Sequence, residues 1–201
     1  KKDRTYLPEG TPNAYGGYYT KEDIREIVAY AEKRCIEVIP EIEFPAHSDE
    51  VFVGYPELCC MGKPYAGGEF CAGNEQTYTF MEDVLTEVID LFPSAYVHIG
   101  GDEALGGDEV STHLWEQCPK CQKIYKQENM TSWHELQDYF TKRVSEIVRS
   151  KGKRMIGWDE ISKNQLQPAS TVVSYRGQEF ASYAANKGYK VVFTPGAALY
   201  F

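Results

Sequence analysis

The sequence predicts an α/β protein folded as a (β/α)8 barrel, here a partial barrel of about five consecutive β/α units. Short β-branched runs alternate with amphipathic helices, each run is apolar throughout, and polar residues cluster directly after each run. This alternation is typical of parallel β/α units, whose strands are covered on both faces. A doubly wound sheet alternates in the same way, but it gathers its ligand-binding residues at one switch point. A barrel gathers them from many strand ends.

The first predicted helix begins after Thr20. Thr20-Lys-Glu-Asp23 has the pattern of a capping box, and apolar residues recur at helical spacing through Ile24–Ala31. The next segment, Cys35-Ile-Glu-Val-Ile39, is a short β-branched run that ends at Pro40. We therefore expect the first strand at Cys35–Ile39.

The same alternation repeats through the rest of the chain. A second capping box, Ser132-Trp-His-Glu135, opens one of the later helices. We expect helices over Thr77–Leu91, Ser132–Lys151 and Glu179–Lys187, and strands over Ala95–Ile99, Arg154–Gly157, Thr171–Tyr175 and Tyr189–Phe193.

Polar and aromatic residues follow every one of these five strands. The segments are Glu41–His47, Gly100–Glu103, Trp158–Glu160, Tyr175–Gly177, and Thr194–Pro195 with Tyr200 soon after. Five consecutive strand ends of this kind favour the TIM barrel over the doubly wound sheet.

A complete barrel has eight strands and typically about 250 residues. This chain has 201 residues, and residues 1–19 contain no convincing strand. We expect residues 1–201 to form one partial catalytic barrel domain that lacks the first strands and the last.

Charge and hydropathy exclude several classes of partner. The chain has 21 Lys and Arg against 30 Asp and Glu, a formal net charge of −9, which argues against binding to nucleic acid. No apolar run approaches the roughly 20 residues of a membrane-spanning helix. The chain opens Lys1-Lys2-Asp3-Arg4 without a signal peptide, although a processed start would look the same.

Six cysteines need an explanation, and Cys118-Pro-Lys-Cys121 is the tightest pair. Zinc needs four ligands, and a second pair at similar spacing is missing. A redox motif would begin a helix after a strand, whereas this pair is expected in a loop before an independent helix. We expect disulfides Cys118–Cys121 and Cys60–Cys71, with free buried thiols as the alternative, and hence an extracytoplasmic location: periplasmic, cell-surface or secreted.

The adjacent carboxylates Asp102 and Glu103 follow a strand and two glycines. A solvated acidic turn is one interpretation. Paired carboxylates in a cleft also suit glycoside hydrolysis, in which one protonates the leaving oxygen and the other stabilises positive charge. Neighbours on a strand point to opposite faces, so they cannot easily flank one glycosidic bond. This favours a mechanism in which the substrate supplies the nucleophile.

Five segments in order resemble the catalytic domain of glycoside hydrolase family 20, the β-N-acetylhexosaminidases, of a bacterial type. His98-Ile-Gly-Gly-Asp102-Glu103 resembles the family signature, and Pro40-Glu-Ile-Glu-Phe-Pro-Ala-His47 resembles the segment one strand earlier. The other three are Gly157-Trp-Asp-Glu160, Val173-Ser-Tyr-Arg-Gly177, and Thr194-Pro195 with Leu199-Tyr-Phe201. The resemblance covers essentially the whole chain.

The resemblance implies a role for each matching residue. Glu103 would be the general acid and then the base, and Asp102 would orient the substrate's 2-acetamido group. His47 would lie near Glu103 and tune its pKa. Trp158 and Tyr175 would wall the acetamido pocket, with the Tyr200 hydroxyl on the acetamido oxygen.

The implied activity is retaining, substrate-assisted hydrolysis of terminal β-linked N-acetylglucosamine or N-acetylgalactosamine through an oxazolinium intermediate. The substrate would be an oligosaccharide or glycoconjugate, with no cofactor and no metal. Three positions depart from the family pattern: Glu43 in place of Asp, Ala46 in place of Gly, and Tyr175 in place of Trp.

Two other functions remain open. His47, His98, Asp102 and Glu103 would be the ligands of a metal-dependent barrel hydrolase. The alternative from another class is a carbohydrate-binding domain without catalysis, since the isolated fragment lacks sugar-binding residues that the family supplies from other strands.

Overall fold

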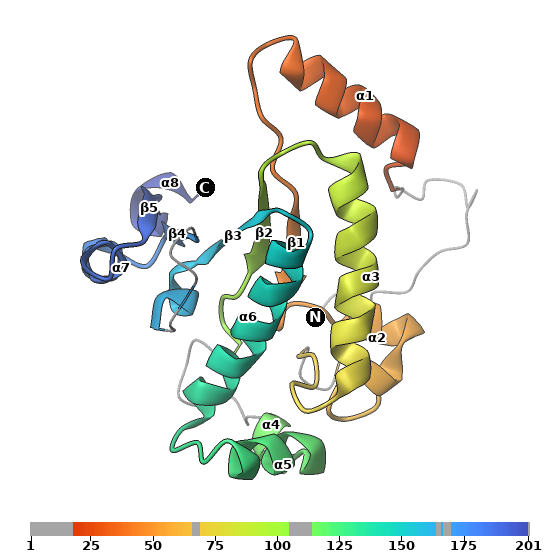
Figure 1. Ribbon diagram of the computed structural model, residues 1–201, viewed down its shortest axis with the longest axis vertical. Helices are drawn as coiled ribbons and strands as arrows, with labels where there is room; N and C mark the ends of the chain where they lie inside the picture. Colours follow the sequence, from red (N-terminus) through yellow and green to blue (C-terminus); the bar gives the residue numbers. More distant parts are fainter. Residues whose placement is uncertain (1–17, 66–68, 105–113, 164–165, 167–169, 201) are drawn as a thin grey trace. The chain divides into compact units, whose positions relative to one another are not determined.

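The computed structural model describes residues 18–65, 69–104, 114–163, 166 and 170–200. The chain divides into two compact units, residues 1–37 and residues 38–201. Helix α1 (Lys21–Glu32) belongs to the first unit, and the strands described below belong to the second (Figure 1). The expectation that residues 1–19 hold no strand falls mainly on residues outside the described part.

Five parallel strands form one sheet. They are β1 (Glu41–Phe44), β2 (Tyr96–Gly100), β3 (Arg154–Trp158), β4 (Thr171–Ser174) and β5 (Lys190–Phe193). Their order in the sheet is their order in the chain, and each neighbouring pair is parallel. A doubly wound sheet reverses its strand order at the switch point, whereas consecutive units of a barrel keep it. The topology is therefore that of five consecutive barrel units.

Helices and short helical turns connect these strands. They are α2 (Val51–Gly54), η1 (Pro56–Leu58), α3 (Glu75–Leu91), α4 (Leu114–Gln117), α5 (Pro119–Gln127), α6 (Trp133–Ser150), η2 (Asp159–Lys163), α7 (Gln178–Asn186) and α8 (Gly196–Leu199). Helices α3 and α6 lie side by side (Figure 1). Helix α6 packs on β3, and α7 packs on β4 and β5. The helices predicted from the sequence form within two residues of the expected bounds.

The core lies between the sheet and α3 and α6. Along α6, Leu136, Phe140, Val144 and Val148 recur every four residues, and all four are fully buried. This spacing places one apolar stripe on one face of a helix. From the sheet, Val97 and other strand residues (Ile99, Met155, Val172) meet them in the same apolar cluster. The strand ends that carry polar residues thus project from a rigid support.

The two predicted capping boxes differ. At α1 the Thr20 side chain accepts from the backbone N–H of Asp23, and the Asp23 carboxylate accepts from the N–H of Thr20. At α6 the N-cap Ser132 makes no side-chain bond to the backbone. The Glu135 carboxylate instead accepts from the backbone N–H of Thr131, at 3.2 Å. The first capping box is confirmed, and the second is only partly formed.

The predicted first strand at Cys35–Ile39 is wrong: the strand is Glu41–Phe44. Cys35 has a positive φ of 57° in the turn after α1, and Ile36 and Ile39 are 58% and 40% exposed. Pairing to β2 begins only where the Pro40 carbonyl accepts from the N–H of His98. Glu41 and Glu43 are therefore part of the strand, and a β-branched run without a neighbouring strand remains unpaired.

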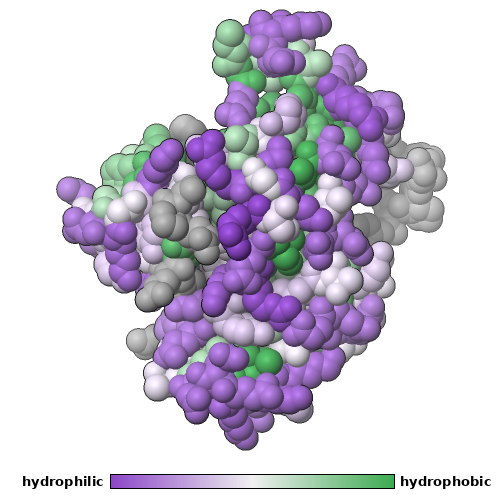
Figure 2. All heavy atoms as spheres, viewed as in Figure 1, coloured by the Kyte–Doolittle hydropathy of each residue, from purple (hydrophilic) through white to green (hydrophobic). Residues whose placement is uncertain are grey.

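Within the described residues, no helix is long and apolar enough to span a membrane. Figure 2 shows a mainly hydrophilic face with apolar areas, one of them around β5 and α8. Val192, Phe193 and Leu199 are about half exposed there. Strand β5 is an edge of the described sheet. A closed barrel has no edges, so in a complete barrel β5 would pair with a further strand.

Candidate active site

A pocket of about 430 Å³ lies at the carboxyl ends of the strands. This volume is within the range of pockets that hold small ligands. All six residues predicted from the sequence line it: His47, Asp102, Glu103, Trp158, Tyr175 and Tyr200. Thr194, Gly196 and Leu199 complete the lining. Thr194 and Leu199 belong to the fifth segment singled out in the sequence, whereas Gly196 was not singled out.

The turn after β2 aims both carboxylates into this pocket. Gly100 and Gly101 have φ values of +68° and +95°, and Glu103 has a φ of 53°. The left-handed region is uncommon for residues other than glycine, and such residues concentrate at functional sites. A Cβ on Gly100 would lie 1.9 Å from the Glu43 carboxylate, so any other residue there would displace that side chain.

Strand β2 ends at Gly100, before the carboxylate pair. The alternation of side chains along a strand, on which the sequence-based argument relied, therefore does not apply to Asp102 and Glu103. The glycine turn lets adjacent residues share one pocket. The two carboxylates nevertheless have different surroundings, because Asp102 is largely buried and Glu103 is half exposed.

His47 lies between the two carboxylates. Its Nε2 atom is 3.5 Å from Asp102 Oδ2 and 3.4 Å from Glu103 Oε2. Like Glu103, His47 has a left-handed backbone, with a φ of 51°. His47 thus lies near Glu103, as the resemblance implied, with one imidazole nitrogen within 3.5 Å of both carboxylates.

The Glu43 carboxyl group lies next to Asp102. Its Oε1 accepts from the backbone N–H of Gly101 at 3.0 Å, and the carbonyl of Gly101 accepts from Gln137 Nε2 at 2.9 Å. Burial, followed by the nearby charge of Asp102, raises the pKa of Glu43 to about 9. At neutral pH Glu43 is therefore protonated and can donate to Asp102. The Oδ1 atom of Asp102 is buried and has no hydrogen-bond partner among the described residues. It is therefore free to accept from the protonated Glu43 carboxyl group or from the N–H of a ligand.

Trp158 and Tyr175 form an aromatic wall. Their rings meet edge to face, with centroids 5.5 Å apart. The Trp158 indole N–H donates to Glu41 Oε1 at 3.0 Å, and His98 packs edge to face on the same indole with centroids 5.0 Å apart. A hydrogen bond from His98 lowers the pKa of Glu41, so this carboxylate remains charged and holds the indole in place.

Tyr175 is oriented by the strand end before it. Its hydroxyl donates to Glu160 Oε1 at 2.8 Å, and its backbone N–H donates to Asp159 Oδ2 at 3.0 Å. Asp159 is completely buried and also accepts from Ser174 and from the Arg176 guanidinium. Burial raises the pKa of Glu160 to about 7, and the Tyr175 hydrogen bond opposes the shift. These carboxylates position the wall and were not assigned roles from the sequence.

The metal alternative is not supported by the geometry. Among the described residues, the acidic, histidine and cysteine side chains that converge enough to hold one ion are Cys60, Cys71, Cys118 and Cys121. His47, His98, Asp102 and Glu103 form no such group, and His98 is buried against Trp158 and Glu41 and does not line the pocket.

Comparison with known proteins decides the family. The sequence model described as glycosyl hydrolase family 20, catalytic domain, matches residues 2–201. The chain belongs to glycosyl hydrolase family 20. A β-hexosaminidase of Porphyromonas gingivalis is 41% identical over an alignment of 197 positions, which covers 94% of this chain and 25% of that protein.

Solved structures of family 20 enzymes share the fold. An exo-β-N-acetylglucosaminidase from Vibrio harveyi, in complex with N-acetylglucosamine, superimposes with a TM-score of 0.78 at 33% identity. A β-N-acetylhexosaminidase from Bacteroides fragilis gives 0.76 at 32% identity. The matches cover 90% and 88% of this chain, and 29% and 36% of those chains. The prediction of a partial (β/α)8 barrel is confirmed, and this family 20 chain spans about a quarter to a third of its relatives' lengths.

Proposed function

We propose that the protein containing this family 20 chain is a β-N-acetylhexosaminidase that hydrolyses its substrate with retention, using the substrate's own acetamido group as nucleophile. The observation that carries the proposal is the convergence of Asp102, Glu103 and an aromatic wall on one pocket. An acetamido group offers an N–H donor, a carbonyl acceptor and a methyl group. The pocket offers a largely buried carboxylate, a tyrosine hydroxyl and aromatic faces to match them.

In the first step the acetamido carbonyl oxygen forms a bond to C1 while the bond from C1 to the leaving oxygen breaks. Glu103, half exposed at the pocket, donates its proton to that oxygen. Asp102 accepts from the acetamido N–H and stabilises the positive charge of the oxazolinium ion. In the second step water attacks C1, Glu103 takes its proton, and the acetamido group is restored.

The remaining pocket residues orient the sugar. His47 lies within 3.5 Å of both carboxylates and can hold Glu103 toward the leaving oxygen. Tyr200 is 89% exposed at the pocket edge, where its hydroxyl can donate to the acetamido oxygen. Trp158 and Tyr175 pack on the methyl group. Aromatic faces suit this task because they supply apolar area with little loss of side-chain freedom.

The substrate class follows from this recognition. Oligosaccharides and glycoconjugates that end in β-linked N-acetylglucosamine or N-acetylgalactosamine carry the required acetamido group. The names of the relatives, which include exo-β-N-acetylglucosaminidase and β-N-acetylhexosaminidase, support the same class. An extracytoplasmic location, periplasmic, cell-surface or secreted, remains part of the proposal.

A kinetic comparison on the full-length protein tests the proposal. We expect cleavage of an aryl β-N-acetylglucosaminide and not of the matching aryl β-glucoside. Asp102→Asn should lower kcat/KM for the first substrate by about 10²-fold or more, as expected when a charge that stabilises the transition state is removed. Equal cleavage of both sugars would contradict an acetamido nucleophile.

One further variant separates catalysis from simple sugar binding. Glu103→Gln should leave binding of N-acetylglucosamine within a few-fold while lowering turnover by about 10²–10⁴-fold, the usual contribution of a general acid. Unchanged turnover in this variant would assign the acid to another residue. Absence of turnover in the wild type, with sugar binding retained, would favour the carbohydrate-binding alternative.

A further inference from the structure

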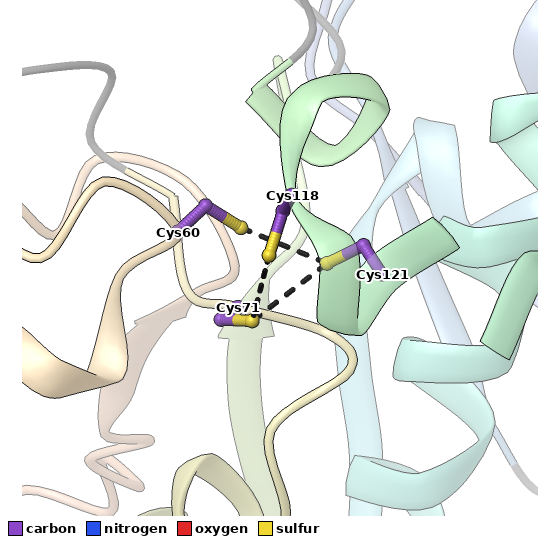
Figure 3. A group of neighbouring side chains, drawn as sticks. All are labelled: Cys60, Cys71, Cys118 and Cys121. Carbon is purple, nitrogen blue, oxygen red and sulfur yellow. Dashed lines mark hydrogen bonds between the residues drawn. The ribbon is translucent and has the colours of Figure 1, made fainter. Parts of the chain in front are cut away.

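Four of the six cysteines gather in one place although they come from two distant segments. Cys60 and Cys71 lie in the connection between β1 and α3, and Cys118 and Cys121 lie at the start of α5 (Figure 3). Cys71, Cys118 and Cys121 are buried, and Cys60 is partly buried. All four sulfur atoms point toward one another and lie within 4.8 Å.

The spacing of the sulfur atoms fits one tetrahedral metal ion. Cys60 to Cys121 and Cys71 to Cys118 are each 3.6 Å, and Cys71 to Cys121 is 3.7 Å. Four thiolates at the Zn–S distance of about 2.3 Å would be separated by about 3.8 Å along each edge of the tetrahedron. A cluster of several iron atoms would hold the sulfurs farther apart. The geometry therefore favours a mononuclear site.

The disulfides predicted from the sequence are not formed. All six cysteines are free thiols in the structure, so the expected pairs Cys118–Cys121 and Cys60–Cys71 are not bonded. Cys71 and Cys121 each contact two other sulfurs. A network in which one sulfur has two equal neighbours fits shared coordination better than pairwise bonds, whose S–S length is about 2.05 Å.

The backbone around the sulfurs is arranged for thiolate ligands. Cys118 is the N-cap of α5 and Cys121 lies in its first turn, where the helix presents unpaired N–H groups and partial positive charge. The pair therefore begins a helix, and the prediction of a loop before the helix was wrong. The backbone N–H of Gly73 also donates to the sulfur of Cys71. N–H donors of this kind stabilise thiolates around a metal.

The two segments are held together independently of the sulfurs. The Trp115 indole N–H donates to the carbonyl of Phe70 at 2.9 Å, and Phe70 pairs with Cys59 in an antiparallel bridge. A Cβ on Gly73 would lie 2.3 Å from the carbonyl carbon of Lys120 and 2.6 Å from the nitrogen of Cys121. Only glycine permits this approach. The thiols are thus placed by the fold before any metal binds.

We propose that Cys60, Cys71, Cys118 and Cys121 bind one structural Zn²⁺ ion. Four protein ligands leave no open position, which is typical of structural and not catalytic zinc. Each thiol releases its proton to solvent as its sulfur binds the metal, and no oxidant is needed. The ion joins the connection after β1, which contains His47, to the start of α5, which follows Asp102 and Glu103 in the chain.

Metal content and thiol state of the full-length protein test this site together. Protein purified without chelator and dialysed should retain zinc, measured by elemental mass spectrometry. Cys118→Ser and Cys121→Ser should each lower the zinc content by one ion per chain. Cys59→Ser is the matched control, because Cys59 is adjacent to Cys60 but bonds to the carbonyl of Lys63, outside the cluster.

A second measurement needs no variant and so survives a folding defect. Unfolding in denaturant with chelator, but without reductant, should make all four cysteines alkylatable, as read by mass spectrometry of the peptides. Cobalt added to the zinc-free protein should give the visible absorption of tetrahedral cobalt thiolate. Disulfides among the four, or four free thiols that bind neither zinc nor cobalt, would overturn the proposal. Bound iron in place of zinc would overturn the choice of metal.

Discussion

At the scale of single residues, the site depends on carboxyl groups whose protonation is set by burial. Glu43 and Glu160 are the two such groups, and Glu43 lies beside Asp102. Burial raises the pKa of Glu43 to about 9 and that of Glu160 to about 7. Glu43 stands where the family pattern has Asp, and its side chain is one methylene longer. It accepts a hydrogen bond from the backbone N–H of Gly101 and keeps its proton beside Asp102. Asp102 can therefore carry the single negative charge that the oxazolinium ion needs.

Glu43→Gln should change how stability depends on pH. In the wild type the folded chain keeps the Glu43 proton up to about pH 9, whereas the unfolded chain loses it near pH 4.5. Between these values the folded state binds more protons, so the Glu43 contribution to stability falls as pH rises. A glutamine side chain does not titrate, so it makes no pH-dependent contribution. Its amide can still accept from the Gly101 N–H and donate to Asp102. The stability of Glu43→Gln relative to wild type should therefore increase from pH 5 to pH 9.

Urea unfolding of both proteins at pH 5, 7 and 9 measures this difference. Glu146→Gln, an exposed position on α6, is the control and should follow the wild type. A difference between Glu43→Gln and wild type that is constant across the three pH values would show that Glu43 is ionised at neutral pH.

Sequence reasoning found the residues that line the pocket and missed those that support them. His47, Asp102, Glu103, Trp158, Tyr175 and Tyr200 are at strand ends, where the motifs are visible. The supporting groups have no local pattern. Gln137, on α6, reaches Gly101 over 36 positions in the chain, and Glu41 reaches Trp158 over 117. Contacts of this range depend on how the strands are paired.

At the scale of elements, glycines allow neighbouring segments to pack closely against each other. Gly101 has its φ in the left-handed region, and a Cβ there would lie 2.6 Å from Ile161. This contact fixes the turn after β2 against η2. The error in the first strand also belongs to this scale, because Cys35–Ile39 has strand-forming residues but no partner strand.

Gly73→Ala should damage the cysteine site without touching a sulfur. Its Cβ would overlap the backbone of Lys120 and Cys121, which cannot move without shifting α5. Overpacking of this kind costs about 1–3 kcal/mol. We expect a lower Tm and a reduced zinc content.

Gly54→Ala provides the comparison, because nothing lies within 4 Å of a Cβ at that position. Its Tm and zinc content should equal those of the wild type. If Gly73→Ala behaved in the same way as Gly54→Ala, the two segments would not need their close backbone approach to form the site.

At the scale of the molecule, strand order and composition answer different questions. Alternating strands and helices predicted parallel β/α units, and the sequential order of the five strands identified the barrel. The cysteine count suggested disulfides because Cys60 and Cys71 lie eleven positions apart and resemble no zinc motif. The bridge between Cys59 and Phe70 brings them together. A zinc site would remove the argument from cysteine content for an oxidising compartment. The extracytoplasmic location is therefore still only a prediction.

The central claim is that the substrate's acetamido oxygen attacks C1 within the pocket formed by Asp102, Glu103 and the aromatic wall. The most direct test uses a series of aryl glycosides with N-acetyl, N-fluoroacetyl, N-difluoroacetyl and N-trifluoroacetyl groups and the full-length protein. Fluorine withdraws electrons from the carbonyl oxygen, so kcat/KM should fall steeply and continuously along the series. A rate independent of fluorine content would contradict the account, because the nucleophile would then belong to the protein or to water.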